Sequence, residues 1–252
     1  MRDSEQYTAK YFRDNHPVKK NKKSSWLVRV CYRKLSFYAT AFAYKIGLYA
    51  NMVSFIGLIM AFVAAGLFII PNKVCNIIAV GVCFVWIIGD CVDGNLARLV
   101  EKQPYGEFID ACGSYTLVAF ILPAIGLAAY RTGNSVLLHN SAWIVFLGGI
   151  AGLCDCMARL YFQKYKNEKM IMEGIKNEQS AVAGDEGINR LYGIYMRLSK
   201  EIGLTGLFVP FLLVSVLFGW LDVFTIFYFL FYGLNFASTV VLLIKITGCL
   251  KK

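Results

Sequence analysis

Six apolar runs, each near the length that crosses a lipid bilayer, constrain this chain more than any other feature. A helix needs about 20 mostly apolar residues to span the hydrocarbon core. Hydrophobic residues make up 58% of the chain and charged residues 17%, which is more apolar surface than one water-soluble core can bury. We therefore exclude a soluble enzyme and predict an all-α integral membrane protein. The predicted transmembrane helices are Tyr49–Ile70, Val74–Leu96, Phe108–Tyr130, Ala142–Phe162, Ile202–Trp220 and Val223–Ile246.

The distribution of basic residues predicts the orientation of these helices. Lys and Arg total 26, and the formal net charge is +10. With both termini in the cytosol, 24 of the 26 lie in cytosolic segments, and only Lys73 and Arg131 lie outside. This is the positive-inside bias of membrane proteins. Because that bias already explains the basic charge and no nucleic-acid-binding fold accompanies it, we expect membrane lipids and no nucleic acid as partners.

The polar segments around the spans complete the predicted domain organisation. Residues 1–24 are polar and basic without the apolar stretch of a signal peptide, so we expect a cytosolic tail. Residues 25–252 form the membrane domain. Within it, residues 25–45 mix aromatic, aliphatic and basic side chains, which predicts an interfacial helix at the membrane surface. Residues 164–200 are polar and interrupted by glycines, which predicts a cytosolic loop with helical ends.

Three carboxylates lie near one end of two neighbouring spans. Asp90 and Asp93 are three residues apart on the second predicted helix, which places them on one side, about 4.5 Å apart along the axis. Asp110 opens the third helix at the same end. Ionisable groups at membrane depth need partners, so they mark functional sites. Clustered carboxylate oxygens suit hard cations, and we expect Mg²⁺ or Mn²⁺, as two ions bridged by the acids.

Small residues and one arginine are interleaved with these acids. Gly94 and Ala97 share a helical face on which a ligand could approach the backbone, and Gly106 would open the next helix in the same way. The planar guanidinium of Arg98 can bind phosphate oxygens. A metal site beside this arginine predicts binding of a diphosphate. The alternative, acids that only cap helices and pair with Arg98 and Lys102, does not require the interleaved small residues.

The pattern D-x-x-D-G-x-x-A-R, followed by G-x-x-x-D, resembles the signature of the CDP-alcohol phosphotransferases. The stretch Asn51-Met-Val-Ser54 is similar to the N-x-x-T/S that begins the first membrane helix of that family. Its members are six-helix membrane enzymes that transfer a substituted phosphate from a CDP-linked donor to an acceptor hydroxyl and release CMP. The resemblance implies the same reaction here, in phospholipid or related membrane-lipid synthesis. CDP-diacylglycerol would pair with a polar alcohol acceptor, and a small CDP-alcohol with a lipid hydroxyl.

The resemblance also implies residue roles. The metal ions would be held by Asp90, Asp93 and Asp110. The CDP pocket would be formed by Gly94, Ala97, Arg98 and Gly106, with Asn51 and Ser54 near the nucleotide. The active site would face the cytosol. The oligomeric state is left open, with a homodimer as one alternative.

The last signature position departs from the family pattern. Where the family has a fourth aspartate, a metal ligand and proposed general base, this chain has Ser114. A neutral hydroxyl neither accepts a proton at neutral pH nor replaces a carboxylate charge. Three explanations stay open. The chain could be a CDP-lipid-binding protein with little or no catalysis, its acceptor oxygen could already be ionised, as in a phosphate, or another carboxylate could act in place of the missing one.

Asp155 is the candidate for such a carboxylate. From the helical rise, Asp155 and Ser114 both lie about 12–14 Å from the cytosolic ends of their helices. The alternative is a local ion pair with Arg159, four residues later on the same face, and both readings can hold together. Arg159 and Lys164 lie at the predicted cytosolic interface, where they could bind an anionic acceptor or extend to lipid head groups.

A cation transporter is the alternative from another functional class, because it too would place acids at membrane depth. Transporters often carry inverted repeats and broken helices with sites near the midplane. In this sequence the acids gather at one end of the spans and no internal repeat is visible.

Overall fold

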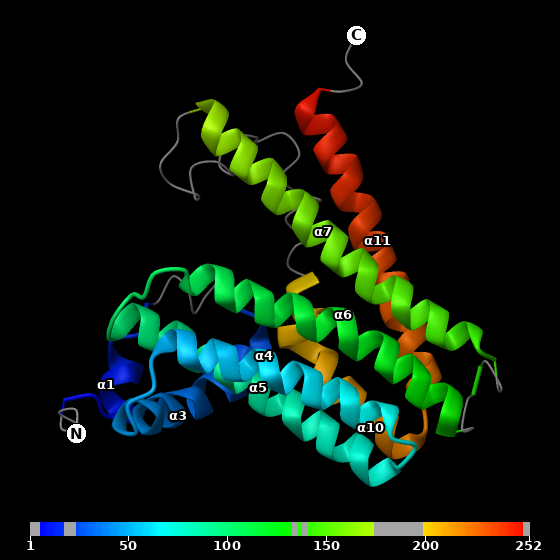
Figure 1. The fold of residues 1–252 in the computed structure, drawn as a ribbon, viewed down its shortest axis with the longest axis horizontal. Coiled ribbons are helices and arrows are strands. Elements are labelled where there is room, and N and C mark those ends of the chain that lie inside the picture. The colour runs from blue at the N-terminus through cyan, green and yellow to red at the C-terminus, as the bar shows by residue number, and fades with distance from the viewer. Residues whose placement is uncertain (1–5, 18–23, 133–135, 138–140, 174–198, 249–252) are drawn as a thin grey trace.

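The computed structural model describes residues 6–17, 24–132, 136–137, 141–173 and 199–248, and the regular elements in this part of the chain are all helical (Figure 1). Within these described residues, six helical stretches are long and apolar enough to cross a membrane, which confirms the predicted all-α fold and span number. They are α4 (Ala50–Ile69), α5 (Lys73–Leu99), α6 (Gly106–Thr132), α7 (Trp143–Glu173), the stretch Ser199–Phe218 and α11 (Leu221–Thr247).

Most of the predicted spans agree with these helices to within a few residues, because the helices end at residues that stop them. The side chain of Asn72 accepts a hydrogen bond of 2.8 Å from the backbone N–H of Val74 and so caps α5. Gly219, with φ of 77°, ends the fifth span in the left-handed conformation that glycine adopts at little cost. The exception is α7, which continues past the predicted end at Phe162. Residues 174–198, the middle of the predicted loop, lie outside the described residues.

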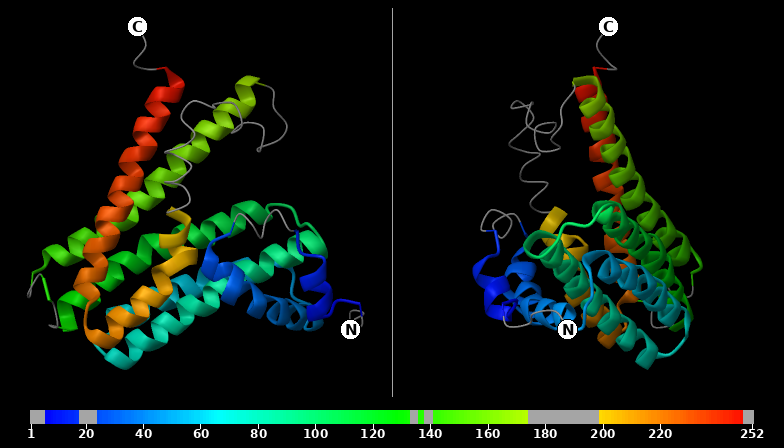
Figure 2. Two further views of the ribbon diagram at one scale, coloured as in Figure 1. Left: turned by 180° about the vertical axis from the view of Figure 1, so that it is seen from behind. Right: turned by 60° about the vertical axis from the view of Figure 1, so that its left-hand side comes forward.

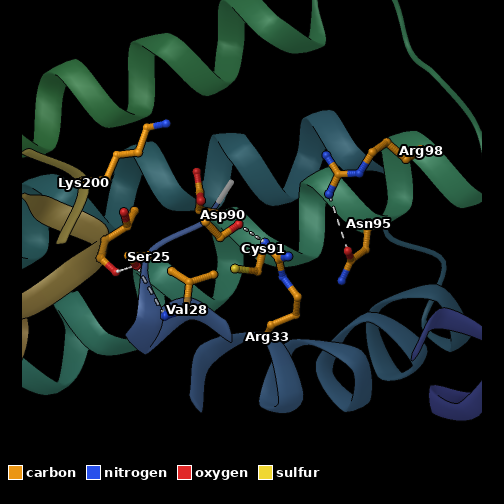
Figure 3. Close-up of a pocket in the computed structure, with 10 residues that line it drawn as sticks. Ser25, Val28, Arg33, Asp90, Cys91, Asn95, Arg98 and Lys200 are labelled. Carbon is orange, nitrogen blue, oxygen red and sulfur yellow. Dashed lines mark hydrogen bonds between the residues drawn. The ribbon is translucent and has the colours of Figure 1, made fainter. Parts of the chain in front are cut away.

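The predicted interfacial segment is helical and packs across α5. It consists of a π-helical turn, η1 (Val28–Tyr32), followed by α3 (Arg33–Lys45). The buried amide of Asn95 on α5 lies 3.3 Å from the Ser36 hydroxyl and 3.2 Å from the Thr40 hydroxyl of α3. The opposite side of α3 exposes Tyr38 and Phe42, as expected of a helix at a membrane surface. Residues before this helix, including Ser25, lie close to α5 (Figure 3).

A short helix before the interfacial segment adds a contact that composition did not predict. This helix, α1 (Ala9–Asp14), packs on α3. Phe12 is completely buried, and the ring centroids of Tyr7 and Tyr44 lie 4.5 Å apart. The described part of the segment expected to be a polar tail therefore contains a helix that packs on α3.

Glycines bring α6 and α7 unusually close together. A Cβ atom added at Gly126, Gly148 or Gly152 would lie 2.5 to 3.0 Å from a backbone oxygen of the facing helix. Those oxygens belong to Ile144, Leu122 and Val118, respectively. Membrane helices associate through close packing because lipid offers no hydrophobic driving force between them, and small residues permit that approach. These contacts fix the antiparallel register of α6 and α7.

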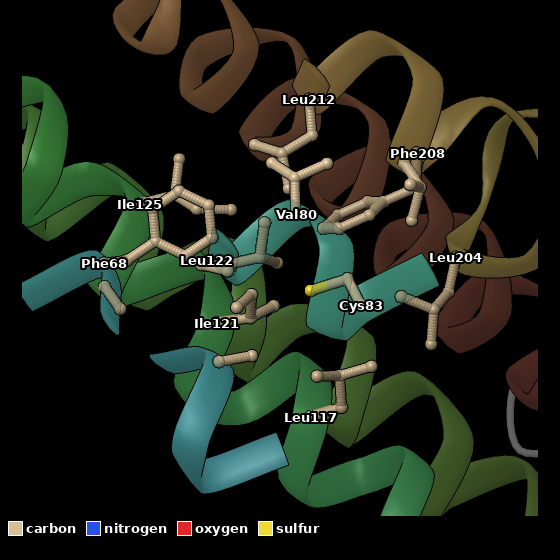
Figure 4. Close-up of a cluster of buried hydrophobic side chains, with 14 of the residues drawn as sticks. Phe68, Val80, Cys83, Leu117, Ile121, Leu122, Ile125, Leu204, Phe208 and Leu212 are labelled. Carbon is tan, nitrogen blue, oxygen red and sulfur yellow. The ribbon is translucent and has the colours of Figure 1, made fainter. Parts of the chain in front are cut away.

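The apolar core joins α4, α5 and α6 to the start of the fifth span (Figure 4). Its largest members include Phe68 of α4, Ile121 of α6 and Phe208 of η3 (Leu204–Phe208), each fully buried. This packing fixes the parts of α5 and α6 that carry the three acids relative to each other. The other pair, α7 and α11, lies side by side and leans away from α4 to α6 (Figures 1 and 2).

The fifth span bends near its beginning. Gly206 has non-helical torsions (φ −105°, ψ −121°) between residues Ser199–Thr205 and α10 (Val209–Phe218). A Cβ atom at Gly206 would collide with the backbone oxygen of Glu201, so only glycine fits this bend. The bend places Lys200 and Thr205 along the walls of two cavities described below.

Candidate active site

Three carboxylates converge where α5 and α6 meet. One oxygen from each of Asp90, Asp93 and Asp110 lies within 4.8 Å of the others. Asp93 is buried and accepts a hydrogen bond of 2.6 Å from the Ser54 hydroxyl of α4, which fixes its orientation. The spacing of the acids in the sequence predicted this convergence. An all-oxygen, anionic set of this kind fits a hard divalent cation.

Small residues at the α4 interfaces permit this arrangement. A Cβ atom added at Gly113 of α6 would lie 3.7 Å from the backbone oxygen of Ser54. A Cβ atom added at Gly57 of α4 would lie 3.4 Å from the indole nitrogen of Trp86 on α5. Because α4 can approach both neighbours, the Ser54 hydroxyl reaches the Asp93 carboxylate.

A cavity of about 860 Å³ opens on one side of the carboxylates and gathers all the predicted nucleotide-pocket residues. Asp93 and Asp110 line it. So do Asn51, Ser54, Gly94, Ala97, Arg98 and Gly106. The loop between α5 and α6, including Gln103 and Tyr105, supplies another wall that motif spacing did not identify.

Asn51 ties this loop to the start of α4. Its backbone N–H donates to the Gln103 side chain at 3.0 Å, and its amide nitrogen donates to the Pro104 carbonyl at 2.9 Å. The buried Asn51 Oδ1 accepts no hydrogen bond from the described residues. It therefore remains available to a donor on a ligand in the cavity.

Gly94 has a specific neighbour in the structure. A Cβ atom there would lie 2.7 Å from Arg98 Nη2 and 2.8 Å from Nη1. The guanidinium of Arg98 thus packs against the backbone of Gly94, and its Nη2 lies 3.5 Å from Asn95 Oδ1. The missing side chain at position 94 makes room for the arginine as well as for a ligand.

A second cavity, of about 490 Å³, also reaches the carboxylate cluster. Asp110 lines both cavities, and Asp90, Ser114 and Asp155 line the second. The Ser114 hydroxyl donates to the Ala111 carbonyl of its own helix at 3.1 Å. Both cavities therefore reach the acid cluster, and they share Asp110.

The two basic residues predicted near this cavity are placed differently. Arg159 lines the cavity and pairs with Asp155, with 2.6 Å between Nε and Oδ2, so the local ion pair and the cavity position hold together. Lys164 is not among the residues that line the cavity, and it pairs with Glu168 at 2.9 Å on the exposed surface of α7. Lys200, which the sequence did not single out, lines the cavity instead.

A third, smaller cavity of about 250 Å³ adjoins Asp90 (Figure 3). Its cationic side chains are Arg33, Arg98 and Lys200, contributed by three separate parts of the chain. Arg33 is buried and donates to the Ser24 hydroxyl at 2.7 Å. Burial lowers the pKa of Arg33, but from an ordinary value so high that the guanidinium stays charged at neutral pH. No sequence motif indicated Arg33.

Comparison with known protein families supplies the remaining observation. The family model of the CDP-alcohol phosphatidyltransferases matches residues 47–228. The chain belongs to this family. The matched range includes the carboxylate cluster, the loop between α5 and α6, and the Asp155–Arg159 pair. A comparison with curated proteins found no match.

Membership of the CDP-alcohol phosphatidyltransferase family confirms the resemblance drawn from the signature. The family transfers phosphate from a CDP-alcohol to an acceptor in lipid synthesis. Its members are generally dependent on divalent metal, and the acidic cluster provides oxygens for such an ion.

Proposed function

We propose that this protein transfers a substituted phosphate from a CDP-linked donor to an acceptor hydroxyl, with release of CMP, at the cytosolic side of a membrane. The observation that carries the proposal is that two cavities reach one cluster of three carboxylates, whose oxygens lie within 4.8 Å of one another. Transfer between two substrates requires one reacting centre that both can reach. A carboxylate cluster that both cavities reach meets that requirement.

The larger cavity is the proposed donor site. Asn51 Oδ1, which lacks a partner among the described residues, could accept a hydrogen bond from the exocyclic amine of cytosine. Arg98 lies between this cavity and the smaller cationic cavity, where its guanidinium can bind the diphosphate. Because Gly94, Ala97 and Gly106 carry little or no side chain, the nucleotide could approach the backbone of the helices there.

Asp90, Asp93 and Asp110 are the proposed ligands of two Mg²⁺ or Mn²⁺ ions. Bound divalent ions would neutralise charge on the diphosphate and on the departing CMP. The Ser54 hydroxyl holds the Asp93 carboxylate in place, which favours a preformed ligand set. Arg98 adds a fixed positive charge at the edge of the same site.

The second cavity is the proposed acceptor site, and either a polar alcohol or a lipid hydroxyl would enter it. It meets the acids at Asp90 and Asp110, and it shares Asp110 with the proposed nucleotide cavity. An acceptor bound there could attack phosphorus in line with the departing CMP, as phosphoryl transfer requires.

The test is CMP release by the purified full-length protein in lipid nanodiscs. With Mg²⁺, CDP-diacylglycerol and a panel of polar alcohols, or CDP-choline and diacylglycerol, should yield CMP in at least one combination. Asp93→Asn should abolish CMP release, whereas Glu168→Gln, the same acid-to-amide change on the exposed part of α7, should not.

Two other results would replace this proposal. Binding of CDP without CMP release from any donor would identify a CDP-lipid-binding protein, the reading that Ser114 keeps open. Cation flux in proteoliposomes without CMP release would instead identify a transporter.

A further inference from the structure

We infer that Asp155 is the base that takes the proton from the acceptor hydroxyl, in place of the carboxylate missing at Ser114. The inference rests on the proposed function and assigns a further catalytic residue to it.

The glycine contacts place Asp155 at the level of Ser114. Along these antiparallel helices, Gly148 faces Leu122 and Gly152 faces Val118, so each turn forward on α7 moves one turn back on α6. The next turn follows the same register, because the thiol of Cys156 lies 3.7 Å from the carbonyl oxygen of Tyr115. Asp155 and Ser114 are the preceding neighbours of that pair in the sequence. The close packing of the two helices leaves them facing one cavity.

Ser114 and Asp155 both line that cavity together with Asp110. Ser114 is one helical turn from Asp110, about 6 Å along the axis. The Ser114 hydroxyl is bonded to its own helix and cannot act as a base. Asp155 therefore brings a carboxylate to the chamber wall at the level where the signature lacks one.

Arg159 holds the Asp155 carboxylate in a defined direction. Nε of Arg159 binds Oδ2 at 2.6 Å, and the guanidinium lies over the Tyr115 ring, 5.9 Å from its centre. Among the described residues, no hydrogen-bond donor is bonded to Asp155 Oδ1. A base oriented by a second group is the usual arrangement for activating a hydroxyl. Arg159 is thus a positioning residue, with one carboxylate oxygen left for the acceptor.

The facing wall of the cavity provides a second, independent sign of a polar ligand. Tyr232 of α11 is 2% exposed, lines the cavity, and has a hydroxyl with no partner among the described residues. A buried hydroxyl is costly to leave unpaired, so a ligand that bonds to it is favoured. Asn235 and Thr239 continue the same face of α11 along the cavity. These groups would bind the oxygen-rich part of an acceptor whose reacting hydroxyl points to Asp155.

In the proposed step, the acceptor loses a proton as its oxygen takes the phosphate. The acceptor O–H bond breaks and its proton passes to the Asp155 carboxylate. The acceptor oxygen forms a bond to the donor phosphorus that carries the substituent, while the bond from that phosphorus to the bridging oxygen breaks. The bridging oxygen leaves with the electron pair as part of CMP, and Asp155 then returns its proton to water.

The experiment compares Asp155→Asn with the double variant Asp155→Asn/Ser114→Asp in nanodiscs. We expect Asp155→Asn to lower kcat for CMP release by about 100-fold or more, with unchanged binding of CDP in the presence of Mg²⁺. Adding Ser114→Asp, which restores the signature acid, should raise the rate of the Asp155→Asn protein by at least about tenfold. Glu168→Gln is the matched control on the same helix.

The outcomes separate this inference from the proposed function. An Asp155→Asn protein with wild-type kcat, or a folded double variant with no recovery, overturns the assignment of Asp155 alone. A wild-type protein that binds CDP but never releases CMP overturns the proposed function itself. If Asp155→Asn loses CDP binding through misfolding, Asp155→Asn/Arg159→Gln removes the ion pair as a unit. Recovery of CMP release on adding Ser114→Asp to that background then supports the inference, and its absence overturns it.

Discussion

Substitution of Gly94 by alanine tests how the motif positions its arginine. In a helix interior, alanine is favoured over glycine by about 1 kcal/mol, so the substitution alone should stabilise α5. The new Cβ atom, however, would lie 2.7 Å from Arg98 Nη2, which is too close for the guanidinium to stay in place. Because the neighbouring atoms belong to the end of a flexible side chain, the arginine moves and the helix does not. Stability and donor binding should therefore change in opposite directions.

The size of the effect follows from the hydrogen bond that the displaced arginine would lose. A hydrogen bond involving a charged group contributes about 1.5–3 kcal/mol, which corresponds to a loss of roughly 10- to 150-fold in affinity for CDP. Isothermal titration of the nanodisc protein with CDP and Mg²⁺ measures this affinity. Gly81→Ala is the matched control, since it lies on the same helix and has no atom within 4 Å of its added Cβ. That variant should bind CDP like the wild type.

A double-mutant cycle decides whether the arginine is the cause. If Gly94→Ala acts by displacing Arg98, it should add little to the effect of Arg98→Ala. Independent, additive losses in the double variant would refute this reasoning, as would a Gly94→Ala protein that binds CDP with wild-type affinity.

The remaining predictions concern the metal ligands and the helix packing. Ser54→Ala should raise the Mg²⁺ concentration needed for half-maximal CMP release by about 10-fold, because Asp93 loses an orienting hydrogen bond of 2.6 Å. An unchanged Mg²⁺ titration would contradict this. EDTA should abolish CMP release, and Mg²⁺ or Mn²⁺ should restore it; full activity in EDTA would argue against a metal site. Gly148→Leu should destabilise the fold by about 2 kcal/mol or more, measured by thermal unfolding, because its Cβ alone would lie 2.5 Å from the Leu122 carbonyl oxygen. Gly149→Leu is the control, since nothing lies within 4 Å of its added Cβ. Equal stability of the two variants would contradict the packing argument.

The spans and the convergence of the acids could be predicted because both depend on local rules. Apolar runs set where helices cross a membrane, and the rise per residue places Asp90 and Asp93 on one side of α5. The short loop to α6 then brings Asp110 to the same end. The same arithmetic matched the depth of Asp155 to that of Ser114, and the glycine contacts now relate the two helices laterally. The spacing of Gly148 and Gly152 was the signal for that contact.

The walls contributed by distant parts of the chain could not be predicted from motifs. The Ser25 hydroxyl bonds to the Thr205 carbonyl at 2.9 Å, and the Trp26 N–H bonds to the Glu201 carboxylate at 2.8 Å. These contacts join residues 180 and 175 positions apart, and pairing at such separations leaves no local pattern in the sequence. For the same reason the sequence singled out Lys164 and not Lys200, although Lys200 is the lysine that lines the cavity.

The shared boundary at Asp110 also bears on the order of events during turnover. If the two substrates occupy separate chambers, neither blocks the entry of the other, and both must be present before reaction. Initial rates measured against each substrate would then give intersecting double-reciprocal lines, the pattern of a ternary complex. A modified enzyme carrying the phosphate between half-reactions would not be needed, because donor and acceptor would meet at the acid cluster.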